Sequence, residues 1–174
     1  TRTCWRTSTM PDTQDIVINT SPLIALVAAL GDLSVLQMYR QVWVPLEVSE
    51  ELAAGGTAKF ALAEYQAADW LHKRTQPLTI APHLLNTLDK GEASVIQLAL
   101  YKSIQTVVID ETAGRRIARL NGLAVTGSIG ILLRARSEGR SFSMRKAIDR
   151  MQARDIWLSD RVIAFALAQA GETR

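Results

Sequence analysis

Short apolar segments, each followed by a helical pattern, constrain the fold of this sequence most. Ile16–Ile18 has no polar residue at alternate positions, which is typical of a strand buried on both faces of a parallel sheet. Similar segments follow at Val42–Val44, residues 106–109 and residues 123–126. Alternating strands and helices predict an α/β fold, a three-layer sandwich around a central, mostly parallel sheet of about four or five strands.

Helix signals lie between and after these strands. Ser21 followed by Pro22 reads as an N-cap and a first helical residue, and this helix is predicted to reach about Arg40 with an interruption at residues 31–32. A fifth, short strand is predicted around residues 70–73, and a proline-containing connector follows it. Further helices are predicted over residues 46–54, 59–68, 90–101, 112–121, 129–137, 143–154 and 160–170.

Composition excludes several classes of protein. The chain has 174 residues, of which 48% are hydrophobic, so it can bury a sizeable core. Its one cysteine, Cys4, excludes a disulfide framework and fits a reducing, cytoplasmic location. No apolar run reaches the ~18 residues of a membrane span. We expect residues 1–14 to be an N-terminal extension, disordered or vector-derived, ahead of a single domain over residues 15–172.

Positive charge is concentrated in the C-terminal third. The net charge is +3, yet residues 111–161 carry ten arginines and one lysine against five acids. Arginine offers bidentate contacts to phosphate, so this segment suits a polyanion such as RNA. Solvated surface charges and basic helix ends would give the same composition, and both explanations stay open.

Polar residues gather where the predicted strands end or shortly after. Ligands of open parallel sheets bind beyond the carboxyl ends of the strands. Oxygen ligands that are scattered in sequence but converge at this edge suit Mg²⁺ or Mn²⁺, which leave positions free for a phosphate. The residues that the sequence brings there are Asn19, Ser21, Glu51, Asp89, Glu92, Asp110, Glu111 and Ser128.

Each main candidate also has a purely structural explanation. Asp110 could N-cap the helix that follows it, and Asp89 with Glu92 has the spacing of a capping box. Glu51 could lie on a solvated helix face, and Asn19 could form a local turn. It is the occurrence of all of them near strand ends that favours a metal site.

Other chemistries lack their residues. The sequence has no phosphate-binding loop, no glycine-rich dinucleotide motif after a strand and no nucleophile elbow. Its two histidines, His72 and His83, are too few and too far apart for a histidine-based metal motif. A phosphorylated switch that uses Asp110 as phosphoacceptor is disfavoured, because no acidic cluster directly follows the first strand.

Several blocks of the sequence together resemble the PIN-domain family, in particular a subfamily found in bacteria and archaea. They span about residues 16–139 and occur in the family's order. The blocks are INTSPLIAL at residues 18–26, LDKGEA at 88–93, VVIDE at 107–111, RIA at 116–118 and GLAVTGSIGIL at 122–132.

The resemblance implies a Rossmann-like sheet and a ribonuclease site that depends on Mg²⁺ or Mn²⁺. Glu92, Asp110 and Asn19 are then expected to be the metal ligands. Because Asn19 stands where the general pattern has an acid, the site carries one negative charge fewer. By position, the four acidic sites of the family fall on Asn19, Glu51 (with Glu47 and Glu50 as alternatives), Glu92 and Asp110.

The expected partners follow from the same resemblance. Arg115, Arg116 and Arg119 are expected to hold the RNA backbone. Family members often act as toxins of toxin–antitoxin pairs, which implies a small antitoxin encoded nearby. We also expect a homodimer. The alternative to a nuclease is a PIN-fold module that binds nucleic acid or protein and catalyses weakly or not at all.

Overall fold

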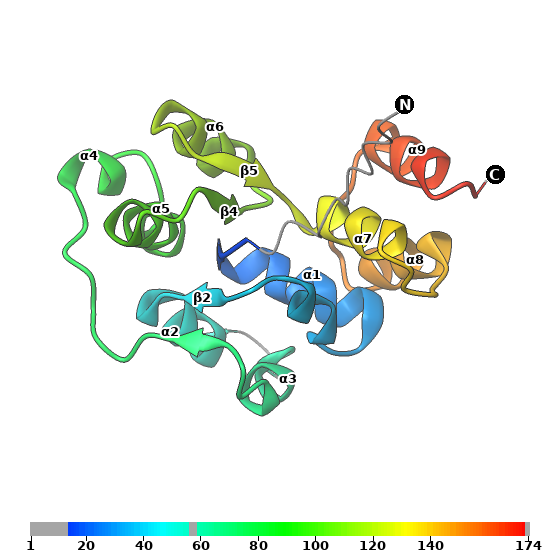
Figure 1. The fold of residues 1–174 in the computed structure, drawn as a ribbon, viewed down its shortest axis with the longest axis horizontal. Coiled ribbons are helices and arrows are strands. Elements are labelled where there is room, and N and C mark those ends of the chain that lie inside the picture. Colours follow the sequence, from blue (N-terminus) through cyan, green and yellow to red (C-terminus); the bar gives the residue numbers. More distant parts are fainter. Residues whose placement is uncertain (1–13, 56–58, 173–174) are drawn as a thin grey trace, which may run out of the picture.

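Five parallel strands form the centre of the computed structural model, which describes residues 14–55 and 59–172. Their order across the sheet is β3-β2-β1-β4-β5, so the chain starts in the middle and builds outwards in both directions (Figure 1). Apart from Gln14, the expected extension lies outside the described residues. The strands are β1 (Ile16–Ile18), β2 (Val42–Val44), β3 (His72–Lys73), β4 (Thr106–Val108) and β5 (Ala124–Thr126).

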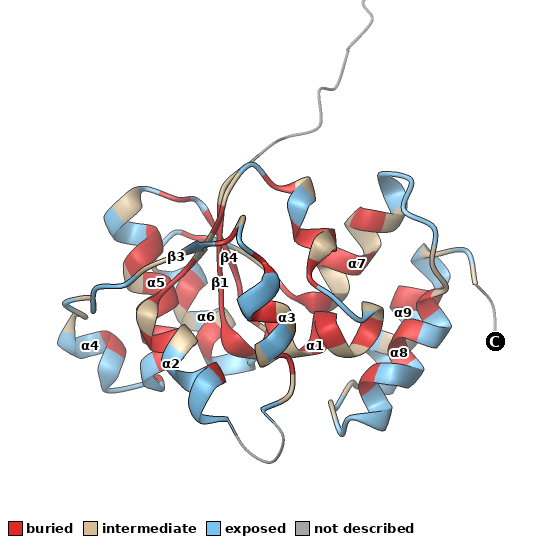
Figure 2. Cartoon of the chain, turned by 90° about the horizontal axis from the view of Figure 1, so that it is seen from below, coloured by how far each residue is buried: buried red, intermediate tan, exposed pale blue. Residues whose placement is uncertain are grey.

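Helices cover both faces of the sheet, which confirms the predicted three-layer α/β fold. In Figures 1 and 2, α2, α5 and α6 lie on one side and α1, α7, α8 and α9 on the other. Their bounds are α1 (Thr20–Leu30), α2 (Leu46–Ala54), α3 (Leu62–Ala67), α4 (Pro82–Leu85), α5 (Lys90–Lys102), α6 (Thr112–Leu120), α7 (Ser128–Ser137), α8 (Met144–Ala153) and α9 (Asp160–Gln169), with a 3₁₀ helix, η1 (Ser34–Met38), after α1.

The core lies on both faces of the central strands, and Figure 2 shows the helices turning their buried sides towards the sheet. Every residue of β1 is fully buried, as are Val107 and Val108 of β4. Continuous burial explains why these strands lack polar alternation in the sequence. None of the helices in the described part of the chain is long and apolar enough to cross a membrane.

The first helix begins two residues earlier than predicted. Its N-cap is Asn19, not Ser21, and Pro22 is its third residue. The first backbone N–H groups of a helix have no partner within it, so proline is tolerated here without losing a hydrogen bond. The predicted interruption at residues 31–32 is confirmed, because Gly31 takes a left-handed conformation (φ 88°) and donates its N–H to the Val27 carbonyl oxygen, and the 3₁₀ helix η1 follows.

Two further predictions were inaccurate in detail. The helix predicted over residues 59–68 begins only at Leu62, after Ala61 in a left-handed conformation (φ 71°). The predicted connector after β3 ends in an unpredicted single turn of helix, α4, with Pro82 as its first residue. A short helix with few apolar residues leaves too little periodic signal to be recognised.

Pairing between β1 and β4 sets the position of the candidate site. The two strands are in parallel register, with Ile18 opposite Val108. The pairing continues past β1, because the backbone N–H of Asn19 donates to the carbonyl oxygen of Val108 at 3.0 Å. The residues that follow the two strands therefore emerge beside one another at the carboxyl edge of the sheet.

Candidate active site

Asn19 is buried at the end of β1 and has a free side-chain oxygen. Its Nδ2 donates to Oε2 of Glu111 at 3.5 Å. Its Oδ1 is buried and has no hydrogen-bond partner among the described residues. The side chain makes no capping bond to α1, so a capping role does not explain it. A buried acceptor without a donor costs free energy, and a cation could satisfy it.

Glu51 is the acid of α2 that approaches Asn19. Its Oε2 accepts a hydrogen bond from Oγ1 of Thr20 at 3.0 Å. Residue 91 is a glycine, and a Cβ there would clash with Oε2 of Glu51 and lie 3.4 Å from Oδ1 of both Asn19 and Asp89. Gly91 thus marks the point where these three side-chain oxygens converge, and it keeps that space open.

The other acids of α2 point elsewhere. Glu47 is buried, and its Oε1 accepts a hydrogen bond from the backbone N–H of Leu78 at 3.0 Å. Glu50 is exposed. The geometry therefore favours Glu51 as the second acidic position.

Asp89 and Glu92 form the capping box that their spacing indicates. Asp89 Oδ1 accepts from the Glu92 N–H at 2.8 Å, and Glu92 Oε2 accepts from the Asp89 N–H at 3.4 Å. The structural explanation of this pair is therefore correct. It leaves Oε1 of Glu92 outside the box, facing α6, where a Cβ on Gly114 would lie 2.8 Å from it. One carboxylate oxygen of Glu92 thus remains for another role.

Glu111 lies between Asn19 and Ser21 and contacts both. Its two carboxylate oxygens accept hydrogen bonds from Asn19 Nδ2 and from the Ser21 hydroxyl. It is the N-cap residue of α6 by position, but its side chain makes no capping bond. Glu111 therefore links the segments that follow β1 and β4.

Four carboxylates, Glu51, Asp89, Glu92 and Glu111, form an acidic cluster around Asn19. Burial raises the pKa of Glu92 to about 7, and the charges of Asp89, Glu111 and Glu51 add to the rise. Burial also raises the pKa of Glu51. The hydrogen bond from Thr20 lowers this pKa, whereas the charges of Asp89 and Glu111 raise it further. Crowded negative charge of this kind is relieved either by protons or by a bound cation.

Asp110 lies at the same edge of the sheet, but its side chain contacts the start of α7. Its Oδ1 accepts from the backbone N–H of Ser128 at 2.8 Å, so it caps α7 and not the helix that follows it. Burial raises its pKa, the bonds to Ser128 oppose this, and the charge of Glu111 raises it further. Beside it, Nη1 of Arg115 donates to the Ile109 carbonyl oxygen at 2.9 Å.

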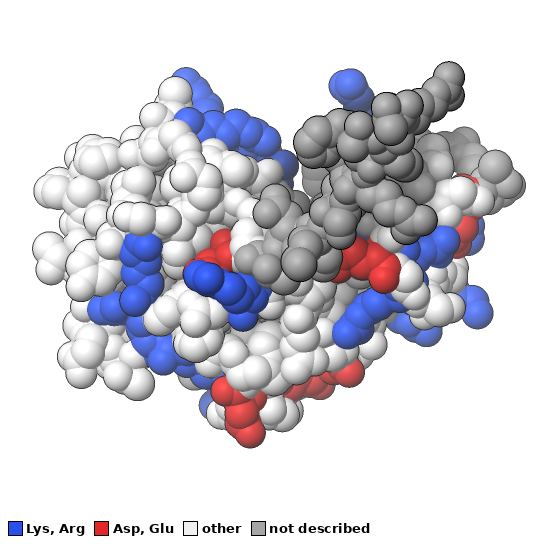
Figure 3. Space-filling view, viewed as in Figure 1, with Lys and Arg blue, Asp and Glu red and all other residues white. Residues whose placement is uncertain are grey.

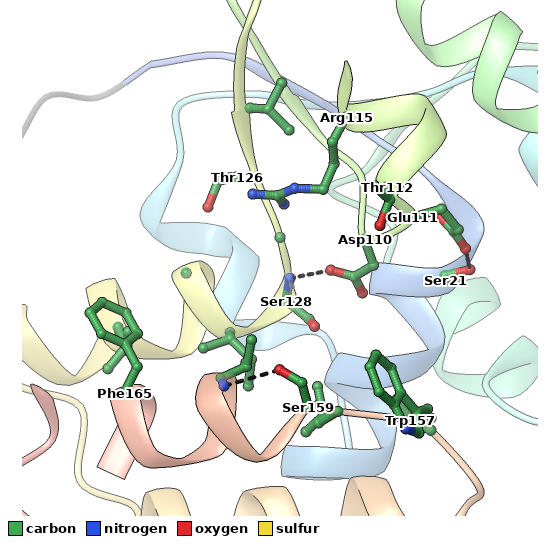
Figure 4. A pocket seen from close by; sticks show the side chains of 18 of the residues that line it. Ser21, Asp110, Glu111, Thr112, Arg115, Thr126, Ser128, Trp157, Ser159 and Phe165 are labelled. Carbon is green, nitrogen blue, oxygen red and sulfur yellow. Dashed lines mark hydrogen bonds between the residues drawn. The ribbon is translucent and has the colours of Figure 1, made fainter. Parts of the chain in front are cut away.

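An open cleft of about 870 Å³ begins at Asp110 and extends towards α9 (Figure 4). One side is polar, with Arg115, Asp110 and Ser128. The other side is apolar and includes Trp157 and Phe165, which are 83% and 55% exposed. The cleft therefore offers hydrogen-bonding groups opposite flat apolar surfaces.

The final helices contribute more to this cleft than their sequence indicated. The helix predicted from residue 160 does begin there, and its start signal is Ser159, whose side chain accepts a hydrogen bond from the Val162 N–H at 3.1 Å. Trp157, just before this start signal, was not recognised as a site residue. Of the three arginines expected to hold RNA, Arg115 alone lines the cleft, and Arg116 and Arg119 are exposed on α6.

The chemical type of the donor atoms fits a hard divalent cation. They are all oxygens, and they include the free Asn19 Oδ1 and carboxylates whose repulsion a cation would offset. As the side chains lie, no three His, Cys, Asp or Glu residues of the described segments are grouped to hold a metal ion. Mg²⁺ keeps several waters and often takes only one or two carboxylates, so a three-acid shell is not required.

Comparison with known proteins agrees with the fold. A family model described as a PIN domain matches residues 15–172, which is nearly the whole chain. The chain belongs to the PIN-domain family. PIN domains are generally nucleases and typically use divalent metals. Among curated proteins, no match was found.

The acidic cluster generates a prediction about pH and stability. In EDTA, the protein should be more stable near pH 5 than near pH 8. The folded-state pKa of Glu92, about 7, lies above its ordinary value of 4.5. Its contribution is therefore fully present below about pH 4.5 and is lost as the pH rises through about 7, by roughly 2 to 3 kcal/mol.

Thermal melts of Glu92→Gln measure this contribution, because glutamine can keep the capping box without titrating. The variant should lose most of the difference between the two pH values. Glu50→Gln, which removes an exposed carboxyl from α2, is the matched control and should keep the wild-type profile. If the stability of Glu92→Gln varied with pH as in the wild type, the pH dependence could not be assigned to Glu92.

Proposed function

We propose that this protein is a metal-dependent endoribonuclease of the PIN type. The observation that carries the proposal is the buried, unpartnered Oδ1 of Asn19 amid four carboxylates at the carboxyl edge of the sheet. Membership of a family whose members are generally nucleases supports it.

In this proposal Glu92, Asp110 and Asn19 would hold a Mg²⁺ or Mn²⁺ ion. A bound ion would lower the pKa of a coordinated water and offset charge at the scissile phosphate. Glu51 and Glu111 add negative charge around the ion, and Ser21 and Thr20 orient these two carboxylates by hydrogen bonds. Asp89 fixes the backbone around Glu92 through the capping box.

The cleft beside Asp110 supplies a place for the RNA chain. Its polar side presents Arg115 and Thr126 to a phosphate or ribose. Its apolar side presents Trp157 and Phe165, whose exposed rings suit stacking of unpaired bases. The substrate we infer is therefore single-stranded RNA that passes between α6 and α9.

RNA cleavage should require Mg²⁺ or Mn²⁺ and both main carboxylates. Asp110→Asn keeps an oxygen for the Ser128 N–H, and Glu92→Gln keeps the capping box, so both variants should fold. Each should cut RNA about a hundredfold more slowly or worse, since metal assistance is worth several kcal/mol. Glu50→Gln is the matched control and should cut at the wild-type rate. Gel assays with and without EDTA measure these rates.

Equal rates in wild type and Asp110→Asn would contradict this mechanism.

A second function is favoured by one observation, namely that Asn19 supplies a neutral oxygen where the family pattern has an acid. It is a nucleic-acid-binding module of the same fold with weak or no catalysis. RNA binding that needs no divalent ion, together with no cleavage by wild type, would support that alternative over the nuclease.

Trp157 provides a separate test of the RNA path. Trp157→Ala should weaken binding of single-stranded RNA by about tenfold or more, because stacking of one base is worth about 1–3 kcal/mol. The indole is 83% exposed, so the melting temperature should not fall. Leu120→Ala is the matched control, since Leu120 is 72% exposed but does not line the cleft. If both variants weakened RNA binding equally, or if neither weakened it, the RNA would have to bind elsewhere.

The biological setting is proposed on family grounds. We infer that the protein acts as the toxin of a toxin–antitoxin pair in the cytoplasm, forms a homodimer and is held by a small antitoxin encoded nearby. The exposed apolar side chains of α9, Val162 and Phe165, line the cleft, so an antitoxin that covered them would exclude RNA. Light scattering that gives only the monomer mass of 19.1 kDa would contradict the dimer.

A further inference from the structure

A group of basic and aromatic side chains lies away from the cleft, on the β3 side of the sheet. Figure 3 shows Lys and Arg side chains running over the part of the molecule where α5 and β3 lie. A small surface hollow of about 260 Å³ is lined there by Trp43 and by residues 72–76. We call this group the flank patch, and its members are Trp43, His72, Lys73, Arg74, Tyr101 and Lys102.

The aromatic rings of the flank patch are held by stacking. The rings of Trp43 and His72 lie 4.7 Å apart at 28°. Lys102 Nζ lies 4.0 Å from the centre of the Trp43 ring. The guanidinium carbon of Arg74 lies 5.8 Å from the centre of the Tyr101 ring, and that tyrosine is 70% exposed. The cations are thus positioned by aromatic faces, and one ring remains open to solvent.

Arg74 and Lys102 carry the available charge of the flank patch, because Lys73 donates to the Tyr65 carbonyl oxygen at 2.7 Å and lies within reach of the charge of Asp69. Within the described segments, no carboxylate forms an ion pair with Lys73, Arg74 or Lys102, and no acid lines the hollow. Nε of Arg74 is buried and has no hydrogen-bond partner among the described residues. Cations held beside an exposed ring are suited to phosphates spaced along a chain whose bases can stack.

We propose that the flank patch is a second binding surface for single-stranded RNA, on which phosphates contact Arg74 and Lys102 and a base stacks on Tyr101. The proposal rests on RNA being the ligand of this protein, as the proposed function has it. It does not depend on the catalytic chemistry. A surface remote from the carboxylates would retain the substrate while the cleft positions one phosphate.

The test measures binding of a single-stranded oligouridylate to the full chain in EDTA, on an Asp110→Asn background that prevents cleavage. Arg74→Gln/Lys102→Gln should bind about tenfold more weakly, and the slope of log affinity against log salt should fall by about 1.4. Arg145→Gln/Lys146→Gln removes the same charge from exposed positions on α8 and is the matched control. It should change the affinity by about twofold at most, since few contacts are lost.

Tyr101→Ala separates RNA from phosphate alone. Being largely exposed, this residue can be replaced without loss of fold, and thermal melts check this for every variant. The change should weaken oligouridylate binding and leave the binding of inorganic polyphosphate unchanged. Equal losses in the two double variants, or parental affinity in Arg74→Gln/Lys102→Gln, would overturn the flank patch. Both readouts are binding, so an absence of cleavage in the wild type would count against the proposed nuclease and not against this surface.

Discussion

The parallel pairing of β1 with β4 is the constraint on which the site depends. The bond from the Asn19 N–H to the Val108 carbonyl extends this pairing beyond the strands. It fixes Asn19 in a buried position and brings the Asp110-Glu111 segment next to it. Helices α2 and α5 then add Glu51 and Glu92 from the other side. Strand pairing and helix packing therefore bring carboxylates from distant parts of the chain together despite their mutual repulsion.

This repulsion is the physical link between fold and function. A carboxyl buried beside other carboxyls holds its proton more tightly, as the raised pKa of Glu92 indicates. The fold tolerates this cost because other groups donate hydrogen bonds to these carboxylates. The Asp89 N–H donates to Glu92, and the Thr20 hydroxyl donates to Glu51. The carboxylate oxygens that remain are available to a cation. A bound cation would both stabilise the folded chain and supply the proposed chemistry.

Much of the fold could be predicted because burial leaves a direct trace in the sequence. Ile16–Ile18 and Val42–Val44 lack polar alternation, and both are strands at those residues. The edge position of Asn19 and Asp110 followed from the same pattern. The cleft could not be predicted in this way, because its apolar side depends on how α9 packs against α7. Nothing local distinguishes Trp157, left in solvent beside a cleft, from a tryptophan in the core.

The central claim is that the oxygens around Asn19 bind a divalent cation, and calorimetric titration with Mn²⁺ of the wild type and of Asn19→Asp tests it most directly. The substitution turns the group that carries the free acceptor at the end of β1 into a charged carboxylate. We predict that both proteins bind one Mn²⁺ and that Asn19→Asp binds it about tenfold more tightly, a gain of about 1.4 kcal/mol. The absence of Mn²⁺ binding, or equal affinity of the two proteins, would contradict the account.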